Sequence, residues 1–348
     1  MLKGLPGTRD AGEDWDVHNA ACLVQCGYRR DRDVAPSVWR RDEGSGWGGL
    51  LYYVDDAARA GTPATNAAAW TELRQHYTLS EPTLLGRMLG SLYSTIFLGQ
   101  HRAVLRIDQR PYWQHALECY RADGGSTDGP SIGMPSAPHE RCAVPPPHVS
   151  HPAKHVGKLL FGQRSSGPHL KYAIRALACN VSSWCEDDDA RLYRIMRYLH
   201  QHPFVHDLFV DRRDCGLVSI VSYADADFGT EVPSRHSTSS CDVFIVGPHG
   251  THALIDSISV RQTSVSLSTP ESEVDALIRA SKATISAQLL CEFPSQTRMP
   301  RGALSDAKSA ILAIKKGHSQ QMRHMRITQC PPSDFIGVHA GLSLSWAR

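Results

Sequence analysis

The stretch from residue 217 to residue 316 constrains the fold most strongly, because strand and helix patterns follow one another there in a definite order. In chain order the segments are β-prone runs at 217–223, 242–246 and 253–259, a helical pattern at 270–291, a short strand at 302–305 and a helix at 306–316. This order suits a mixed sheet covered by helices. We therefore expect an α/β and α+β fold, and the length of 348 residues allows two or three domains.

Acidic residues stand at strand ends and helix starts throughout this stretch. Asp225 and Asp227 follow the first strand, Glu271 and Glu273 open the long helix, and Asp306 follows the last strand. Clustered carboxylates repel one another unless cations neutralise them, and their hard oxygen atoms suit Mg²⁺. The pattern predicts a divalent-metal site for phosphodiester chemistry.

Local geometry leaves several of these assignments open. Asp225 and Asp227 would point to one face of a strand, so Asp227 is either an auxiliary ligand or, as we favour, the start of the turn toward Gly229. Glu271 and Glu273 lie about 200° apart on a helix and flank its apolar stripe, and periodicity does not choose between them. An Asp just before a helix is also a typical N-cap, which is the alternative role for Asp306.

Composition excludes several classes of protein. A net charge of only +2 shows no strong electrostatic commitment to nucleic acid. The ten cysteines contain no C-x-x-C pair, which argues against a zinc site and against a disulfide framework. No apolar run reaches the length of a membrane span and no signal peptide opens the chain. We expect an intracellular protein of the cytoplasm or nucleus, not secreted and without a membrane partner.

The first half of the chain carries a second acidic signal. A strongly β-prone run at residues 50–54 ends in Asp55 and Asp56. Gly, Pro, Ser and His dominate residues 123–153, which predicts a linker or long loop. The other expected elements are helices at 12–30, 63–76, 112–122, 156–178 and 188–200, and strands at 89–97 and 103–107.

Motifs in both halves resemble one family in the same order. Residues 51–56 read L-Y-Y-V-D-D and match the L-x-Y-V-D-D polymerase motif of copia-type retrotransposons. Residues 223–228, Y-A-D-A-D-F, resemble its Y-S-D-A-D-W segment, and residues 305–311, S-D-A-K-S-A-I, resemble C-D-N-Q-S-A-I. Residues 266–277 likewise resemble S-L-S-S-x-E-A-E-Y-x-A-L. The chain thus resembles the C-terminal part of the Pol polyprotein of these elements.

The resemblance implies a domain order. It comprises a partial reverse transcriptase palm at 1–82, the end of the palm and the entry to the thumb at 83–122, a low-complexity linker at 123–153, a helical thumb or connection at 154–205, a ribonuclease H-like domain at 215–330 and a tail at 331–348. In this scheme the C-terminal mixed sheet with helices is the ribonuclease H-like fold. The N-terminal part is a fragment of the palm and thumb.

The resemblance also implies a mechanism and a substrate. Asp225, Glu273 and Asp306 would bind two Mg²⁺ ions and hydrolyse the RNA strand of an RNA–DNA hybrid. The family register, Glu-x-x-Ala-Leu, favours Glu273 over Glu271. The family has a fourth acid where this chain has Arg326. A cation beside two metal ions predicts weakened metal affinity and slow or absent turnover, unless Arg326 turns outward onto substrate phosphate.

Asp55 and Asp56 are implied to be the remnant of the polymerase site. The chain begins at the segment that follows the family's earlier catalytic Asp, so we expect no independent polymerase activity. The missing upstream part of the Pol polyprotein is an expected partner. A catalytically inactive retroelement relic that at most binds nucleic acid is the alternative.

Overall fold

The structure is a computed structural model, and it describes residues 11–44, 46–54, 56–130, 133, 148–231, 234–317, 319, 322 and 336–338. The chain forms two compact units. Unit 1 comprises Met1–Leu89 and Gln288–Arg298, and unit 2 comprises Gly90–Ala287 and Met299–Arg348. We describe each unit by itself.

Unit 1 is a three-stranded antiparallel sheet with two helices. Its elements are α1 (Ala11–Gln25), β1 (Val38–Glu43), β2 (Gly46–Tyr53), β3 (Asp56–Ala60), α2 (Pro63–Leu73) and the short β4 (Arg87–Met88). The sheet order is β1-β2-β3. Leu23, Trp39, Leu50 and Leu73 form its buried core with Cys26 and Tyr28. Thr62 begins α2 because its hydroxyl accepts a hydrogen bond from the Thr65 N–H.

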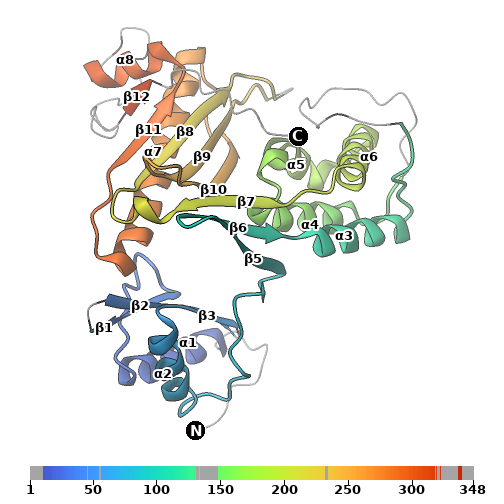
Figure 1. Cartoon of the computed structure of the whole chain (residues 1–348). Coiled ribbons are helices and arrows are strands. Elements are labelled where there is room, and N and C mark those ends of the chain that lie inside the picture. The colour runs from blue at the N-terminus through green and yellow to red at the C-terminus, as the bar shows by residue number, and fades with distance from the viewer. Residues whose placement is uncertain are drawn as a thin grey trace. The chain divides into compact units, whose positions relative to one another are not determined.

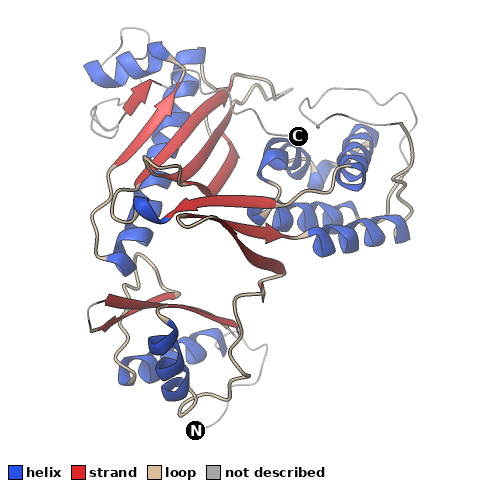
Figure 2. Cartoon of the chain, viewed as in Figure 1, coloured by secondary structure: helices blue, strands red, loops and turns tan. Residues whose placement is uncertain are grey.

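Unit 2 is built on one mixed sheet (Figures 1 and 2). Its strands are β5 (Ser91–Leu98), β6 (Arg102–Asp108), β7 (His206–Asp211), β8 (Ser219–Asp227), β9 (Thr238–Val246), β10 (His252–Arg261), β11 (Arg301–Ser305) and β12 (Ile336–Val338). They lie in the order β12-β11-β8-β9-β10-β7-β6-β5. Strand β11 runs parallel to both β8 and β12, and the remaining pairs are antiparallel.

The helices of unit 2 form two groups (Figure 1). The first contains α3 (Arg110–Ala122), α4 (Pro152–Ser165), α5 (Lys171–Ala178) and α6 (Glu186–Gln201), which bury a core that includes Trp113, Leu159, Ile174 and Leu192. The second contains α7 (Thr269–Ser295) and α8 (Lys308–Lys316). These two helices share a core with the sheet through Ala224, Val274, Leu277, Ala303 and Ile311.

The alternation of β8 decides which face α7 covers. Ile220, Ser222 and Ala224 are buried, and Ala224 packs in the core that contains α7. Successive strand residues face opposite sides, so Tyr223 and Asp225 lie on the other face. Small alanines in the shared core let the helix approach the strands closely. The side chains of β8 are therefore divided between the helix-covered face and the face that carries Asp225.

The mixed α/β architecture expected from the sequence is confirmed. From β8 to α8 the order is strand, strand, strand, helix, strand, helix, as the hydrophobic pattern predicts. The helix expected at 156–178 is wrong as one element, because α4 ends at Ser165 and α5 begins at Lys171. Gly167 and Pro168 lie between them, and a proline cannot donate the backbone hydrogen bond that a continuous helix needs.

Unit 2 joins segments that lie far apart along the chain. Strands β5 and β6 belong to the same sheet as β7–β11, and the helices α3–α6 belong to the same unit. No helix in the described part of the chain is long and apolar enough to cross a membrane.

Candidate active site

The register of β8 and β11 brings Asp225 and Asp306 to the carboxyl ends of two neighbouring parallel strands. The two strands are parallel, with Ala303 opposite Ser222 and Leu304 opposite Tyr223. Continuing that register by two residues places Asp306 beside Asp225, just beyond the end of β11. Neighbouring strands lie about 4.8 Å apart, so both carboxylates emerge close together from residues far apart in sequence.

Helix α7 supplies Glu273 to the same region. The hydroxyl oxygens of Thr284 and Ser222 are 2.7 Å apart in a buried hydrogen bond between α7 and β8. Glu273 lies eleven residues before Thr284, which is about three helical turns, so both residues are on one face of α7. This hydrogen bond therefore turns the Glu273 side of the helix toward β8. Glu273 is only 5% exposed.

Electrostatics show that these three acids influence one another. The pKa of Glu273 is raised to about 7, first by burial and then by the negative charges of Asp225 and Asp306. The pKa of Asp225 is also raised, first by loss of solvation and then by Asp306 and Asp227, although Asp225 as a whole residue is exposed. One carboxylate oxygen of Glu273, Oε2, is buried without a hydrogen-bond partner. The chain therefore gathers like charges here without neutralising all of them.

The structure separates Glu271 from Glu273. The Oε2 atom of Glu271 accepts a hydrogen bond of 2.8 Å from the Leu267 backbone N–H. This N–H lies just before the first turn of α7, where backbone donors lack helical partners. Glu271 thus stabilises the start of the helix, whereas the pKa of Glu273 responds to the charges of Asp225 and Asp306.

Asp306 is not the cap of the helix that follows it. The N-cap position of α8 is Ala307, and no side chain caps this helix. The Ala307 N–H donates instead to the Ser305 hydroxyl at 3.1 Å. The Asp306 side chain is exposed, so its carboxylate is not committed to the α8 terminus.

Asp227 is held by hydroxyl groups. Its Oδ2 atom accepts a hydrogen bond of 2.5 Å from the Tyr172 hydroxyl and another from the Thr230 hydroxyl. The Ser237 hydroxyl accepts a hydrogen bond of 3.0 Å from the Gly229 N–H in the same turn. These contacts fix Asp227 at the turn that leaves β8.

A lysine from α5 lies beside the acids. Lys171 is 9% exposed, and its Nζ atom donates to Asp242 Oδ1 at 2.5 Å and to the Cys241 carbonyl at 3.2 Å. Its positive charge lowers the pKa of Asp225, against the larger effect of burial. Neither Lys171 nor Tyr172 has a sequence signal for this role. Their partners lie 55 to 71 positions away along the chain, beyond any local pattern.

The described residues contain no set of three or more His, Cys, Asp and Glu side chains that could hold a metal ion as they stand. Arg326, at the position of the expected fourth acid, lies outside the described residues, as does Asp55. The acidic site therefore consists of Asp225, Glu273 and Asp306, whose carboxylates do not converge on one point in the described part of the chain.

The polymerase-like motif forms the tip of a hairpin in unit 1. Tyr53 of β2 pairs with Asp56 of β3, and Val54 follows directly after β2. Val54 adopts a φ of 53°, which is the left-handed region that two-residue hairpin turns require and β-branched residues rarely adopt. Val54 is 61% exposed, and Asp56 is partly buried.

Unit 1 also contains a network of buried charged side chains that could not be predicted from the sequence. The Arg59 side chain has no exposed surface, and it donates to Glu43, to Asn66 and, at 3.0 Å, to the Tyr28 hydroxyl. Arg41 is bound to Glu43 at 3.1 Å. Arg41 also pairs with Glu72, so two guanidinium groups meet two carboxylates and the network is electrically balanced.

Comparison with known proteins gives one relative of interest. Secreted RxLR effector protein 161 from Plasmopara viticola is 30% identical to this chain over 130 residues, which are 37% of this chain and 86% of that protein. No protein-family model matches the sequence.

Proposed function

This chain belongs to the same protein family as Secreted RxLR effector protein 161, and we propose that its unit 2 is a retrotransposon-derived, ribonuclease H-like hydrolase. The substrate would be an RNA–DNA hybrid, and the hydrolysed bond a phosphodiester of the RNA strand. The relative's name describes a secreted effector, whereas the acidic site of this chain points to phosphodiester hydrolysis.

One observation carries the proposal. Asp225, Glu273 and Asp306 come from β8, α7 and the end of β11, and each pKa that is shifted responds to the other acids. These are the three residues that the copia-type motifs select. The sheet that brings them together has the element order of a ribonuclease H-like domain, with β11 parallel to β8.

The three residues fit Mg²⁺ in their chemistry. All the donors are hard carboxylate oxygens, and Glu273 Oε2 is buried without a partner. A buried carboxylate oxygen is costly to leave unpaired, so a cation at this position would stabilise the site. Two bound Mg²⁺ ions would supply activation of the attacking water and stabilisation of the leaving oxygen.

The remaining roles, which are binding the ions and positioning the ligands, would belong to side chains of this chain. Asp225 and Asp306 project from adjacent parallel strands, and would hold the ions at the sheet edge. Glu273 approaches from α7, where the Thr284–Ser222 hydrogen bond fixes its height along β8. Lys171 holds Asp242 and the Cys241 carbonyl on β9, which keeps the neighbouring strand in place.

The test is cleavage of a labelled RNA–DNA hybrid in the presence of Mg²⁺. We expect Asp225→Asn to lower the rate more than about 100-fold, because it removes a metal ligand. Asp187→Asn is the matched control, since Asp187 is an exposed acid on α6 of the same unit. Equal rates for Asp225→Asn and the wild type would refute the proposed site.

A second variant addresses Arg326. If its positive charge suppresses turnover, Arg326→Asp raises cleavage above the wild-type rate. Absence of cleavage in both the wild type and Arg326→Asp would overturn the hydrolase and favour an inactive relic that binds nucleic acid.

A further inference from the structure

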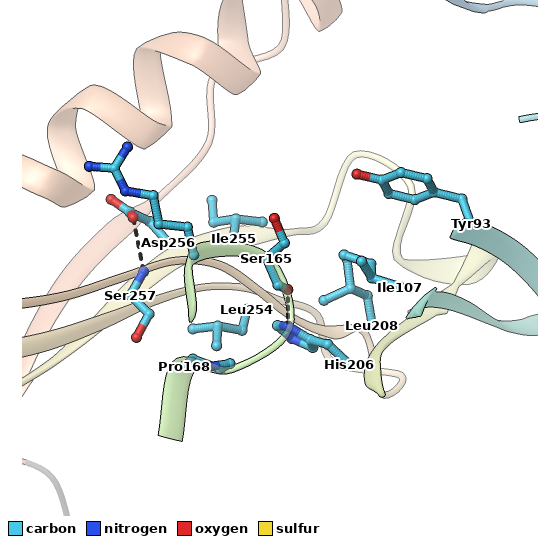
Figure 3. A pocket seen from close by; sticks show the side chains of 11 residues that line it. Tyr93, Ile107, Ser165, Pro168, His206, Leu208, Leu254, Ile255, Asp256 and Ser257 are labelled. Atoms are coloured by element: carbon cyan, nitrogen blue, oxygen red, sulfur yellow. Dashed lines mark hydrogen bonds between the residues drawn. The ribbon is translucent and has the colours of Figure 1, made fainter. Parts of the chain in front are cut away.

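Unit 2 contains a pocket that none of the acidic-site residues lines. It has a volume of about 270 Å³ and lies between the end of α4 and strands β6, β7 and β10, with Tyr93 of β5 at one side (Figure 3). Its walls therefore come from five segments of the chain. Such convergence is typical of ligand sites, which are concave and largely preformed.

The walls are mostly apolar. Ile107 and Leu208 lie side by side on one side of His206, and Leu254 and Pro168 lie together on the other side (Figure 3). An apolar cavity of about 150 Å³ is large enough for benzene, and drug-sized ligands occupy roughly 300–1,000 Å³. The volume of this pocket therefore suits a flat ligand of one or two rings.

The polar groups of the pocket are few and partly occupied. His206 Nδ1 lies 3.0 Å from the Ser165 carbonyl oxygen, which can only accept, so Nδ1 carries the proton. Burial lowers the pKa of His206, which favours the neutral ring with an accepting Nε2 atom. The Asp256 Oδ1 atom accepts from the Ser257 N–H at 2.9 Å. Burial raises the pKa of Asp256, and no hydrogen bond among the described residues engages its second oxygen.

The pocket is connected to the surroundings of the acidic site. The Ser257 hydroxyl donates to Asp242 Oδ1 at 2.6 Å, and the same oxygen accepts from Lys171. Lys171 in turn acts on the pKa of both Asp225 and Asp256. A polar chain thus links the pocket on β10 to the acids on β8 across β9.

We propose that this pocket binds a nucleobase, with its faces against the apolar walls and its polar edge toward His206 and Asp256. A nucleobase combines a flat apolar face with an edge of donors and acceptors, and proteins bind unpaired bases in this manner. The choice of a nucleobase over other flat rings rests on the nuclease proposed above. The base belongs either to a free nucleotide or to an unpaired end of a strand.

Binding is measured by calorimetry on the full chain without Mg²⁺, with each of the four ribonucleoside 5′-monophosphates. Ribose 5-phosphate, which lacks the base, is the control ligand. Ile255→Trp is the blocking variant, because Ile255 lines the pocket and is 38% exposed, so a larger ring fits there without burial in the core. Leu217→Trp, at a residue 55% exposed and away from the pocket lining, is the matched control.

We expect at least one monophosphate to bind the wild type and Leu217→Trp equally, and Ile255→Trp at least tenfold more weakly. Asp256→Asn should change the preference among the four bases, because an amide can donate where a carboxylate only accepts. Absence of binding, equal binding of ribose 5-phosphate, or an unaffected Ile255→Trp would each overturn the proposal.

Two further ligands distinguish the source of the base. A hybrid with a three-nucleotide unpaired end should bind Ile255→Trp more weakly than the wild type if the base belongs to a strand, with a blunt hybrid unaffected. If the wild type and Ile255→Trp bind both hybrids equally, and Ile255→Trp loses only the binding of the monophosphate, the ligand of the pocket is a free nucleotide. Because these measurements involve no cleavage, their failure and the failure of the hydrolase are separate results.

Discussion

Two buried glutamates, one in each unit, have opposite surroundings. The Glu43 side chain of unit 1 is 8% exposed, and Glu273 of unit 2 is 5% exposed as a whole residue, so both carboxyl groups are largely removed from solvent. Burial by itself would raise the pKa of either carboxyl. Hydrogen bonds from Arg59 and Arg41 hold the pKa of Glu43 below its ordinary value, whereas Asp225 and Asp306 help to raise that of Glu273 to about 7.

This difference separates a charge that is satisfied within the fold from one that we propose to be functional. A buried carboxylate that meets a guanidinium is satisfied within the chain and needs nothing else. A buried carboxylate that meets two other acids is satisfied only when something from outside neutralises it. Perturbed groups of the second kind cluster at functional sites, which is why we propose a function for the acids of unit 2 and a structural role for Glu43 of unit 1.

The largest expected effect comes from breaking the balanced network. Arg59→Met leaves Glu43 buried without its main cation, and we expect a loss of about 3 kcal/mol in the free energy of unfolding, measured by urea titration. Arg74→Met is the control, because the Arg74–Glu81 ion pair is largely exposed at Glu81 and should contribute less than about 1 kcal/mol. Equal losses of unfolding free energy in both variants would show that the Arg59 network contributes no more stability than an exposed ion pair.

An intermediate effect is expected at the edge of the acidic site. Tyr172→Phe removes a hydrogen bond to the Asp227 carboxylate and should cost about 1–2 kcal/mol of stability. Tyr198→Phe is the matched control, since no described hydrogen bond involves the Tyr198 hydroxyl. An unchanged thermal midpoint for Tyr172→Phe would mean that Thr230 alone holds Asp227.

The smallest effect concerns Glu273 and depends on pH. Its folded pKa is about 7 against an unfolded value near 4.5, so the folded state binds the extra proton between these values. Stability therefore falls as pH rises from about 4.5 to 7, and Glu273→Gln removes this fall. We expect the variant to match the wild type at pH 4 and to exceed it at pH 8 by on the order of 1 kcal/mol after solvent screening.

Thermal melts at the two pH values measure the difference, and Glu292→Gln is a suitable control acid on the same helix. A wild type that is at least as stable as Glu273→Gln at pH 8 would contradict the comparison between the two glutamates. Mg²⁺ should reduce the gain if it neutralises the acids.

Much of unit 2 could be predicted because its strands and helices have strong periodic patterns. The order from β8 to α8 follows directly from residues 217–316. Strand β7 was missed because Leu208, Phe209 and Val210 are consecutive apolar residues rather than an alternating run. Strand β1 was missed because Arg40, Arg41 and Glu43 look like a solvated segment, while the fold pairs their charges internally.

The sequence identified the acidic residues of the candidate site, but it did not decide between the alternative roles of these residues. Periodicity left Glu271 and Glu273 equivalent, and only the position of the Leu267 N–H relative to the helix start separates them. The alternative cap role of Asp306 was likewise resolved by a neighbour, the Ser305 hydroxyl. Lys171 and Tyr172 could not be identified in advance, because their roles depend on how α5 packs against the sheet.

The parallel pairing of β8 with β11 has a consequence for folding kinetics. Asp225 and Asp306 become neighbours only after β9, β10 and α7, about 80 residues of intervening chain, have been placed between them. Contacts of such long sequence separation close slowly, since the chain loses the entropy of a large loop before it gains the pairing. During refolding, the helical signal should therefore return before the acids come together, and the Mg²⁺ affinity that we propose for them should be among the last properties to appear.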